Sequence, residues 1–235
     1  MRTVFLLSRT SPSLQAQHAQ GRRELKKLTI MLIALFLLAP AVYAEDTALE
    51  APHWTFDIKA GRFMPDLPDW RSYYSRNYVT EYGTSLAYKF IRQAEAGIEV
   101  GYLSAKGLAK APAHQLNTGS VTYTLYPVNA FVLFRGVVKE NQWIVPYAGG
   151  GYTRMYYRES IEDQGTIKGS ANGYHARAGL QILLDGLDPS ASGNMFIEYG
   201  IFHTYLILEA RYTHAVVSST NLGGKSYLAG LLFEF

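Results

Sequence analysis

The sequence predicts an all-β fold, an eight-stranded antiparallel transmembrane β-barrel that is preceded by a cleaved signal peptide. Three observations lead to this prediction: apolar and polar residues alternate in successive segments, short turns alternate with long loops, and the last segment ends on an aromatic residue. Alternation with a period of two indicates strands, because a strand points successive side chains to opposite faces. The strands of soluble β-sandwiches show the same alternation of apolar and polar residues. The leader and the end of the chain are therefore needed to distinguish a transmembrane barrel from a soluble sandwich.

The segment 225–235 carries the strongest argument for a membrane. It runs to the terminal carboxylate as a ribbon with one apolar, partly aromatic face. Such a ribbon is prone to aggregation in water, but it is stable where the apolar face meets lipid and both edges are paired. The residues on the apolar face are Tyr227, Ala229, Leu231, Phe233 and Phe235.

The leader is typical of a secreted protein. An apolar block, 28–42, follows Lys26 and Lys27 and leads into small residues, so we expect cleavage after Ala44. At about 15 residues the block is short for a spanning helix, which needs about 20. The predicted division is therefore a leader and signal peptide, 1–44, and a barrel domain, 45–235.

Composition excludes several classes of protein. The chain has no cysteine, so disulfides and thiolate metal sites are excluded. The predicted leader holds six of the 22 Lys and Arg residues and one of the 19 acids, which leaves 16 basic and 18 acidic residues and a net charge of −2. The basic character of the whole chain belongs to the leader, and we expect no nucleic-acid partner.

The predicted strands alternate with loops of two kinds. Long polar loops are expected at 64–80, 104–117, 159–171 and 215–224, and short turns at 92–94, 138–142 and 185–194. The segment 195–203 fits either a short helix or the beginning of the next strand. The eight strands are expected at 53–63, 82–91, 96–102, 118–137, 143–157, 174–184, 204–214 and 225–235.

The fourth strand changes its apolar face part of the way along. Val121 and Leu125 share one face, but after Pro127 the apolar residues occupy the other face, from Val128 to Phe134. A phase slip of one residue at a proline predicts a β-bulge. A turn at 126–129 that divides the segment into two strands is the alternative.

Ionisable residues lie opposite the apolar faces. In a transmembrane barrel they point into a lumen that eight strands make only wide enough for side chains. We expect them to pair with one another, because an unpaired buried charge is strongly unfavourable. This interior polar network argues against a wide pore and uses His175 as a member rather than as a general base. Its predicted members are Asp57, Lys59, Lys89, Glu99, His175, Arg177, Glu209 and Arg211.

Aromatic residues near the strand ends fit the girdles that anchor barrels at the two membrane interfaces. An even number of strands places both chain ends on one side, where short turns are expected. The predicted girdle residues are Trp54, Phe63, Tyr82, Tyr102, Trp143, Tyr157 and Tyr227.

Two motifs resemble known outer-membrane proteins. The end of the chain, Tyr227 with Gly230, Phe233 and Phe235 in the spacing Gly-x-x-aromatic-x-aromatic, resembles the C-terminal assembly signal of bacterial outer-membrane proteins. The run 146–151, Pro-Tyr-Ala-Gly-Gly-Gly, resembles the mid-barrel strand of the OmpW-like family of small outer-membrane barrels.

The resemblance implies a location and a function. It implies residence in the cell outer membrane, contact with outer-membrane lipid and lipopolysaccharide, and help from the barrel-assembly machinery during biogenesis. It also implies a non-enzymatic role, either structural or as a narrow route or binding site for small, hydrophobic molecules. No cofactor and no metal site are expected, since the histidines show no metal-ligand spacing.

Two alternatives remain from the sequence. A lipid A deacylase-like hydrolase would use His214 with Ser218 or Ser219, although Val216 stands where that family has its serine. Nucleophile and base must come within hydrogen-bond reach for this chemistry. An adhesin or interaction protein would work through the long polar loops 64–80 and 159–171.

Overall fold

The computed structural model describes residues 52–67, 70–108, 120–139, 141–161 and 165–235, so the predicted signal peptide lies outside the described residues. None of the described helices is long and apolar enough to cross a membrane. The elements are β1 (Trp54–Pro65), α2 (Trp70–Tyr74), β2 (Val79–Ile91), β3 (Ala94–Leu108), β4 (Ser120–Arg135), β5 (Ile144–Ile161), β6 (Gly165–Leu183), α3 (Pro189–Tyr199), β7 (His203–Val217), β8 (Thr220–Asn221) and β9 (Gly224–Glu234).

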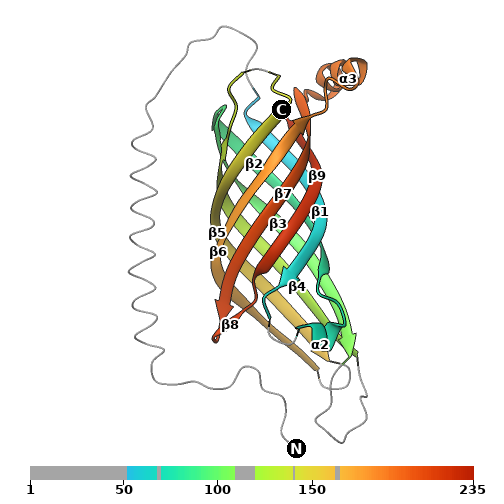
Figure 1. Ribbon diagram of the computed structural model, residues 1–235, viewed down its shortest axis with the longest axis vertical. Helices are drawn as coiled ribbons and strands as arrows, with labels where there is room; N and C mark the ends of the chain where they lie inside the picture. Colours follow the sequence, from blue (N-terminus) through green and yellow to red (C-terminus); the bar gives the residue numbers. More distant parts are fainter. Residues whose placement is uncertain (1–51, 68–69, 109–119, 140, 162–164) are drawn as a thin grey trace, which may run out of the picture. The chain divides into compact units, whose positions relative to one another are not determined.

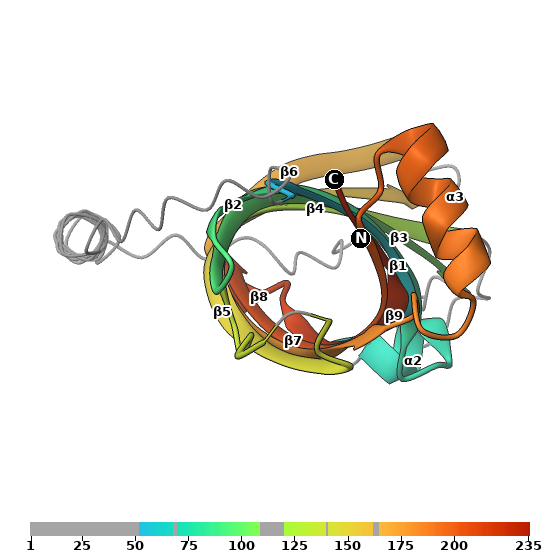
Figure 2. The same cartoon turned by 90° about the horizontal axis from the view of Figure 1, so that it is seen from above.

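Eight long strands close into a barrel. Each pairs antiparallel with its neighbour in the order β6-β5-β4-β3-β2-β1-β9-β7, and β6 pairs with β7 to complete the ring. The two-residue strand β8 only extends the hairpin that follows β7. Figure 1 shows the tilted strands and Figure 2 the closed ring with α3 outside it. The predicted eight-stranded antiparallel barrel is confirmed.

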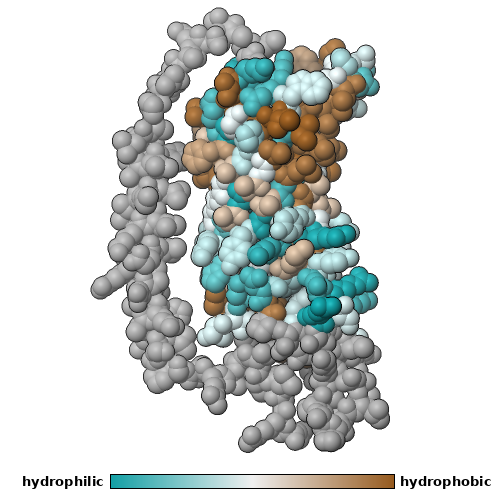
Figure 3. Space-filling view, viewed as in Figure 1, coloured by the Kyte–Doolittle hydropathy of each residue, from teal (hydrophilic) through white to brown (hydrophobic). Residues whose placement is uncertain are grey.

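The barrel has two distinct ends. The turn end carries the C-terminus and α3 and lies at the top of Figure 1, and the loop end carries α2 and β8 and lies at the bottom. On β1, Trp54 and Ile58 are 44% and 48% exposed, whereas Asp57 and Lys59 are 7% and 5% exposed. The apolar residues therefore point outward and the charged residues into the lumen. Figure 3 shows brown, apolar surface toward the turn end and mostly teal, polar surface toward the loop end.

A tyrosine girdle marks the boundary between these two surfaces. Seven of the eight barrel strands each contribute one tyrosine to this girdle, and Arg62 takes the corresponding place on β1, paired with Tyr227. Strands β2 and β5 each expose one further tyrosine, Tyr88 and Tyr156. Tyrosine suits a membrane interface because its ring is apolar and its hydroxyl is polar. The seven are Tyr82, Tyr102, Tyr126, Tyr152, Tyr174, Tyr212 and Tyr227.

Two predicted girdle residues lie elsewhere. Phe63 is buried in the lumen, and Tyr157 packs against the same buried cluster. Their positions follow from the alternation, since each has the inward phase of its strand. Their assignment to the girdle, which rested on aromatic character alone, is therefore wrong. The predicted girdle residues Trp54 and Trp143 are exposed, and they lie at the turn end.

Strand β4 is continuous, so both the predicted bulge and the alternative turn at Pro127 are wrong. Its register with β5 runs without interruption from Val121↔Ile161 to Arg135↔Tyr147. Pro127 fits because the opposing residue is Gly101, on which a Cβ atom would lie 2.7 Å from the proline Cγ. The apolar residues change from one face of β4 to the other at this proline, although inward and outward side chains continue to alternate without a break.

The predicted loop 159–171 is also wrong for most of its length. β5 continues to Ile161 and β6 starts at Gly165, and the two pair throughout, for example Arg158 with Lys168. Polar composition suggested a loop because both faces of this ribbon are largely polar. The segment 195–203 divides between the two alternatives, with α3 ending at Tyr199 and β7 starting at His203.

Candidate functional site: the barrel lumen

The centre of the lumen is organised by one carboxylate, Glu99 on β3, which is 1% exposed. Its Oε2 accepts from Lys59 Nζ at 2.7 Å and from Arg177 Nη1 at 2.9 Å. Its Oε1 accepts from Asn129 Nδ2 at 3.0 Å and from Arg211 Nη1. Donors from β1, β4, β6 and β7 thus meet on a single side chain of β3, which ties five strands together across the lumen.

Three further carboxylates neutralise the cations around Glu99. Glu209 lies 3.5 Å from Lys59 Nζ and 3.6 Å from Arg177 Nη1, and it accepts from the Tyr147 hydroxyl at 3.0 Å. Glu81 accepts from Arg211 Nη2 at 2.8 Å. Asp57 lies 3.3 Å from Lys59 and accepts from Ser85. Charge-assisted bonds of this kind are the strong ones in a site of low dielectric.

His175 belongs to a closed ring of hydrogen bonds. Its Nε2 accepts from Arg177 Nη2 at 3.1 Å, so Nδ1 carries the proton and donates to Thr153 Oγ1 at 2.8 Å. Thr153 donates to Asn129 Oδ1 at 2.7 Å, and Asn129 donates to Glu99. Both ring nitrogens are therefore engaged, and this histidine is a structural member of the network.

A second ionic cluster lies at the turn end. Glu234 bridges Lys89 Nζ at 2.9 Å and Arg135 Nη1 at 2.6 Å. Arg135 also donates through Nε to Gln181 at 2.9 Å and lies over the Tyr205 ring, 5.6 Å from its centroid. Glu95 is buried nearby and is 3.5 Å from the Thr55 hydroxyl.

Apolar side chains fill the remaining lumen in two clusters. The turn-end cluster surrounds the ionic residues there and consists of Ala87, Phe131, Leu133, Val145, Tyr147, Leu183, Tyr205, Ile207 and Leu232. The loop-end cluster includes Trp70 from α2, whose ring stacks on Tyr74 at 4.0 Å. It consists of Phe63, Trp70, Val79, Leu103, Tyr123, Leu125, Met155, Ala171, Ala215 and Leu222.

The structure places all eight residues of the predicted interior network inside the barrel. Seven of them meet around Glu99, and Lys89 lies apart in the ionic cluster at the turn end, with Glu234. The prediction omitted several buried partners on the same inward faces. Strand phase alone could have found most of them, since they alternate with the apolar residues: Glu81, Glu95, Asn129, Arg135, Tyr147, Thr153, Gln181 and Glu234.

The residues of the predicted assembly signal divide between the two faces of β9. Tyr227, Phe233 and Phe235 point outward. Gly230 has the inward phase and closely approaches β1, since a Cβ atom there would lie 2.0 Å from the Ile58 carbonyl oxygen. Glycine at this position permits the pairing of β9 with β1 that closes the barrel.

The hydrolase candidates are not brought together. His214 lies on the outer face against the ring of Tyr174, with 5.3 Å between centroids. Ser218 and Ser219 form the turn between β7 and β8, with φ of 46° and 74°. Within the described part of the chain, no hydrogen bond joins His214 to either serine, and no three His, Asp or Glu side chains are arranged to hold a metal ion.

Comparison with known proteins gives structural matches only. No protein-family model and no curated protein matches the chain. The outer membrane protein OprG from Pseudomonas aeruginosa is 12% identical, with a TM-score of 0.52 over 79% of this chain and 96% of that one. Neisserial surface protein A is 15% identical, with a TM-score of 0.48 over 77% and 97% of the two chains. The Ail protein of Yersinia pestis is 14% identical, with a TM-score of 0.42 over 80% and 100%.

OprG is an outer membrane protein, and the likeness of this chain to it is a likeness of fold. The closed ring, the apolar outer surface and the charged lumen of this chain agree with it. The chain therefore has the fold of the small eight-stranded outer-membrane β-barrel proteins.

Proposed function

We propose that this chain resides in the outer membrane as a non-enzymatic barrel with a closed lumen, and that it binds small molecules at its loop end. The observation that carries the closed lumen is the Glu99 cluster, in which donors from four strands converge on one carboxylate. The loop-end apolar cluster lies beyond it and fills the lumen there with buried side chains such as Leu103, Leu125 and Met155. Eight strands enclose only enough space for such side chains.

The binding site we propose is a pocket of about 270 Å³ between α2 and the adjoining parts of β2 and β3. Aromatic rings of Trp70, Tyr74 and Tyr78 line it together with the cations of Arg76 and Lys106. Trp70 is 6% exposed, and its indole Nε1 is a buried donor that has no hydrogen-bond partner among the residues the structure describes. An aromatic pocket with two cations and a free donor suits a small aromatic anion such as a carboxylate, sulfonate or phosphate.

Fractionation tests the location. Residues 45–235 expressed with the natural leader should reach the outer membrane and migrate differently on gels with and without heating. A soluble periplasmic product would contradict the proposal.

Single-barrel electrical recording tests the closed lumen. The full barrel reconstituted in a planar lipid bilayer should give no steady ionic conductance. Discrete, long-lived conductance steps from the wild-type chain would overturn the closed-lumen proposal.

Tryptophan fluorescence tests the pocket. The chain has three tryptophans, and two of them, Trp54 and Trp143, are exposed on the outer wall. Replacing both by Phe leaves Trp70 as the reporter. Titration with benzenesulfonate should change its emission saturably, whereas uncharged benzyl alcohol should have a much weaker effect.

Matched variants localise the response. Replacing Arg76 and Lys106 together by Gln should weaken benzenesulfonate binding by about tenfold or more, because two charge-assisted contacts are lost. Arg71→Gln is the control, since Arg71 lies on α2 but does not line the pocket. Equal effects of the two sets of variants, or no saturable response, would contradict the proposed site.

A further inference from the structure

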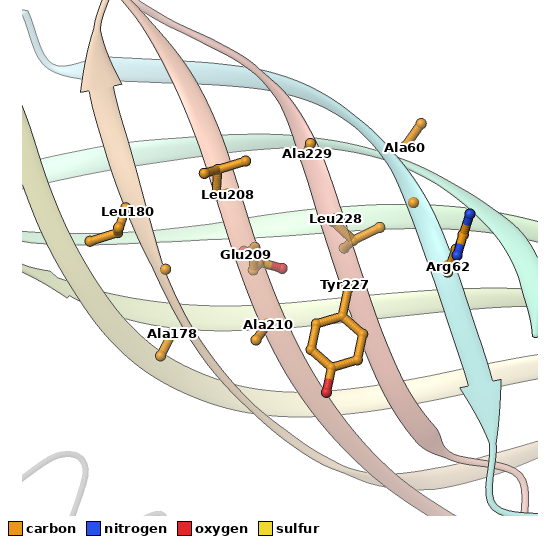
Figure 4. A pocket seen from close by; sticks show the side chains of 12 residues that line it. Ala60, Arg62, Ala178, Leu180, Leu208, Glu209, Ala210, Tyr227, Leu228 and Ala229 are labelled. Carbon is orange, nitrogen blue, oxygen red and sulfur yellow. The ribbon is translucent and has the colours of Figure 1, made fainter.

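The outer wall of the barrel carries a second hollow, which we call the wall groove. It has a volume of about 550 Å³ and lies over β1, β9, β7 and β6 (Figure 4). Four alanines form its base, with Leu180 and Leu208 beside them. Strand register explains the hollow: Ala60 pairs with Ala229 and Ala178 pairs with Ala210, so their methyl groups stand side by side.

The wall groove ends at the tyrosine girdle, beside a cation. Arg62 lines the groove and is paired with Tyr227, and its guanidinium lies 4.7 Å from the centroid of the Tyr78 ring. Lys225 is exposed one step nearer the loop end, paired with Met64. Cross-strand diagonal neighbours lie within reach of each other's long side chains, so Arg62 and Lys225 form a cationic pair on the outer face.

No ion pair balances these two cations. Among the described residues, the outward positions within β1, β6, β7 and β9 include no Asp or Glu, and neither Arg62 nor Lys225 forms an ion pair. The exposed Asp66, which follows β1, accepts a hydrogen bond from Asn221 Nδ2 at 3.4 Å instead. A cation that faces lipid is unfavourable at the bilayer midplane and becomes tolerable near the interface, the depth at which the girdle lies. Two unpaired cations at this depth therefore offer a site for the phosphate of a lipid.

We propose that the wall groove and the Arg62–Lys225 pair together bind a phosphorylated, multiply acylated glycolipid of the lipid A type. One acyl chain lies in the groove along the alanines, and a phosphate on the sugar accepts from the guanidinium of Arg62 and the ammonium of Lys225. Arginine holds phosphate through two parallel N–H donors, and stacking on Tyr78 fixes its plane. The loop end identifies the leaflet, because long loops of such barrels face the outside of the cell, where glycolipid forms the outer leaflet.

The charge complementarity decides between possible occupants. A second copy of this chain would bring its own Arg62 and Lys225 to a two-fold interface and place like charges near one another. A neutral lipid would fill the groove but leave the cations without partners. This inference does not depend on the loop-end pocket, which shares only Tyr78 with the residues used here.

Lipid competition tests the proposal on the full barrel in neutral phosphatidylcholine nanodiscs. The probes are bis-phosphorylated hexa-acyl lipid A, the same lipid with its phosphates removed, and phosphatidylglycerol, and native mass spectrometry counts the lipids retained. We expect one lipid A per barrel, bound about tenfold or more tightly than either competitor. Equal retention of all three lipids would overturn the proposal.

Variants separate the headgroup from the groove. Arg62→Gln with Lys225→Gln should remove the preference for the phosphorylated lipid, and Arg62→Lys should keep part of it. Arg154→Gln is the matched control, because Arg154 also lies over a tyrosine ring, that of Tyr156, but on β5 away from the groove. An equal loss in Arg154→Gln would show general surface charge and would contradict a site.

Filling the groove tests the acyl contact. Ala229→Leu should weaken lipid A binding, while Ala130→Leu, at an exposed alanine on β4, should leave it unchanged. A dimer of the barrel that Ala229→Leu dissociates, with no lipid preference, would assign the groove to a second copy instead.

Discussion

The lumen of this barrel differs between its centre and its loop end, although the same strands build both. On β3, Glu99 faces the ionic centre, and Leu103, two inward positions further along, faces the loop-end apolar cluster. On β4, Asn129 belongs to the centre and Leu125 to the apolar cluster. The outer faces change in the opposite sense, from Ile98 and Phe134 near the turn end to polar residues near the loop end.

This inversion shows that the character of the side chains in the lumen depends on whether the outer face of the same strands is suited to lipid or to water. Between the tyrosine girdle and the turn end, the outer faces are apolar as lipid requires, and the polar groups of the chain gather in the lumen, where they satisfy one another. Beyond the girdle toward the loop end, the strands have a polar outer face and an apolar core, the pattern of a water-soluble barrel. Pro127 lies next to Tyr126 of the girdle. The change of apolar face at this proline therefore marks the boundary between the lipid-facing and the water-facing parts of the outer surface.

The largest expected effect tests the ionic centre. Glu99→Gln leaves Lys59, Arg177 and Arg211 without their common charge partner in a buried site. We expect the free energy of unfolding in detergent to fall by about 3–5 kcal/mol, the usual cost of breaking a buried pair. Glu198→Gln on the exposed face of α3 is the control and should stay within about 0.5 kcal/mol of wild type. Equal values for the two variants would show that the lumen is hydrated rather than closed.

The next effect tests the apolar loop end. Leu125 is 0% exposed, and Leu125→Ala should lower the free energy of unfolding by about 2–4 kcal/mol through lost burial and a cavity. Thr122→Ala, on the outward face of the same strand, should have a much smaller effect. Chemical denaturation followed by tryptophan emission measures both. A cost for Thr122→Ala that matches Leu125→Ala would contradict an apolar core beyond the girdle.

A smaller effect sharpens the description of the centre as one network. Thr153→Val keeps the shape of the side chain but removes the hydroxyl that joins His175 to Asn129. Leaving those two buried groups without a partner should cost about 1–3 kcal/mol. In combination with Glu99→Gln the cost should be less than the sum of the two, because both act on the same hydrogen-bond ring. Additive costs would show two independent sites.

The smallest effect tests the boundary at the girdle. Pro127→Val should lower stability by only about 0.4–1 kcal/mol, mainly because the unfolded chain gains freedom. The cross-strand pairs Val100↔Val128 and Leu103↔Leu125 should persist in NMR spectra of the barrel in micelles. Loss of either pair would mean that the proline, and not the change of solvent, sets the phase of β4.

Much of the lumen followed from strand phase. Asp57, Lys59, Glu99, Arg177, Glu209 and Arg211 stand opposite apolar residues, and alternation alone predicts a common inward face. Glu234 and Arg135 have the same phase, but Glu234 lies in the aromatic end of the chain and Arg135 beyond the supposed bulge, and neither was predicted. The wrong prediction of a bulge at Pro127 thus also affected the predicted site, because it concealed which side chains of β4 point into the lumen.

By itself, the sequence determined the eight strands, their antiparallel order and which face of most strands meets lipid, because period-two alternation is a local property. Only the tertiary structure decided which charges meet, since the convergence of β1, β4, β6 and β7 on Glu99 depends on the shear and closure of the barrel. It also decided that four alanines align into the wall groove. The pairing register between neighbouring strands brings such residues together, and the sequence of a single strand does not determine that register.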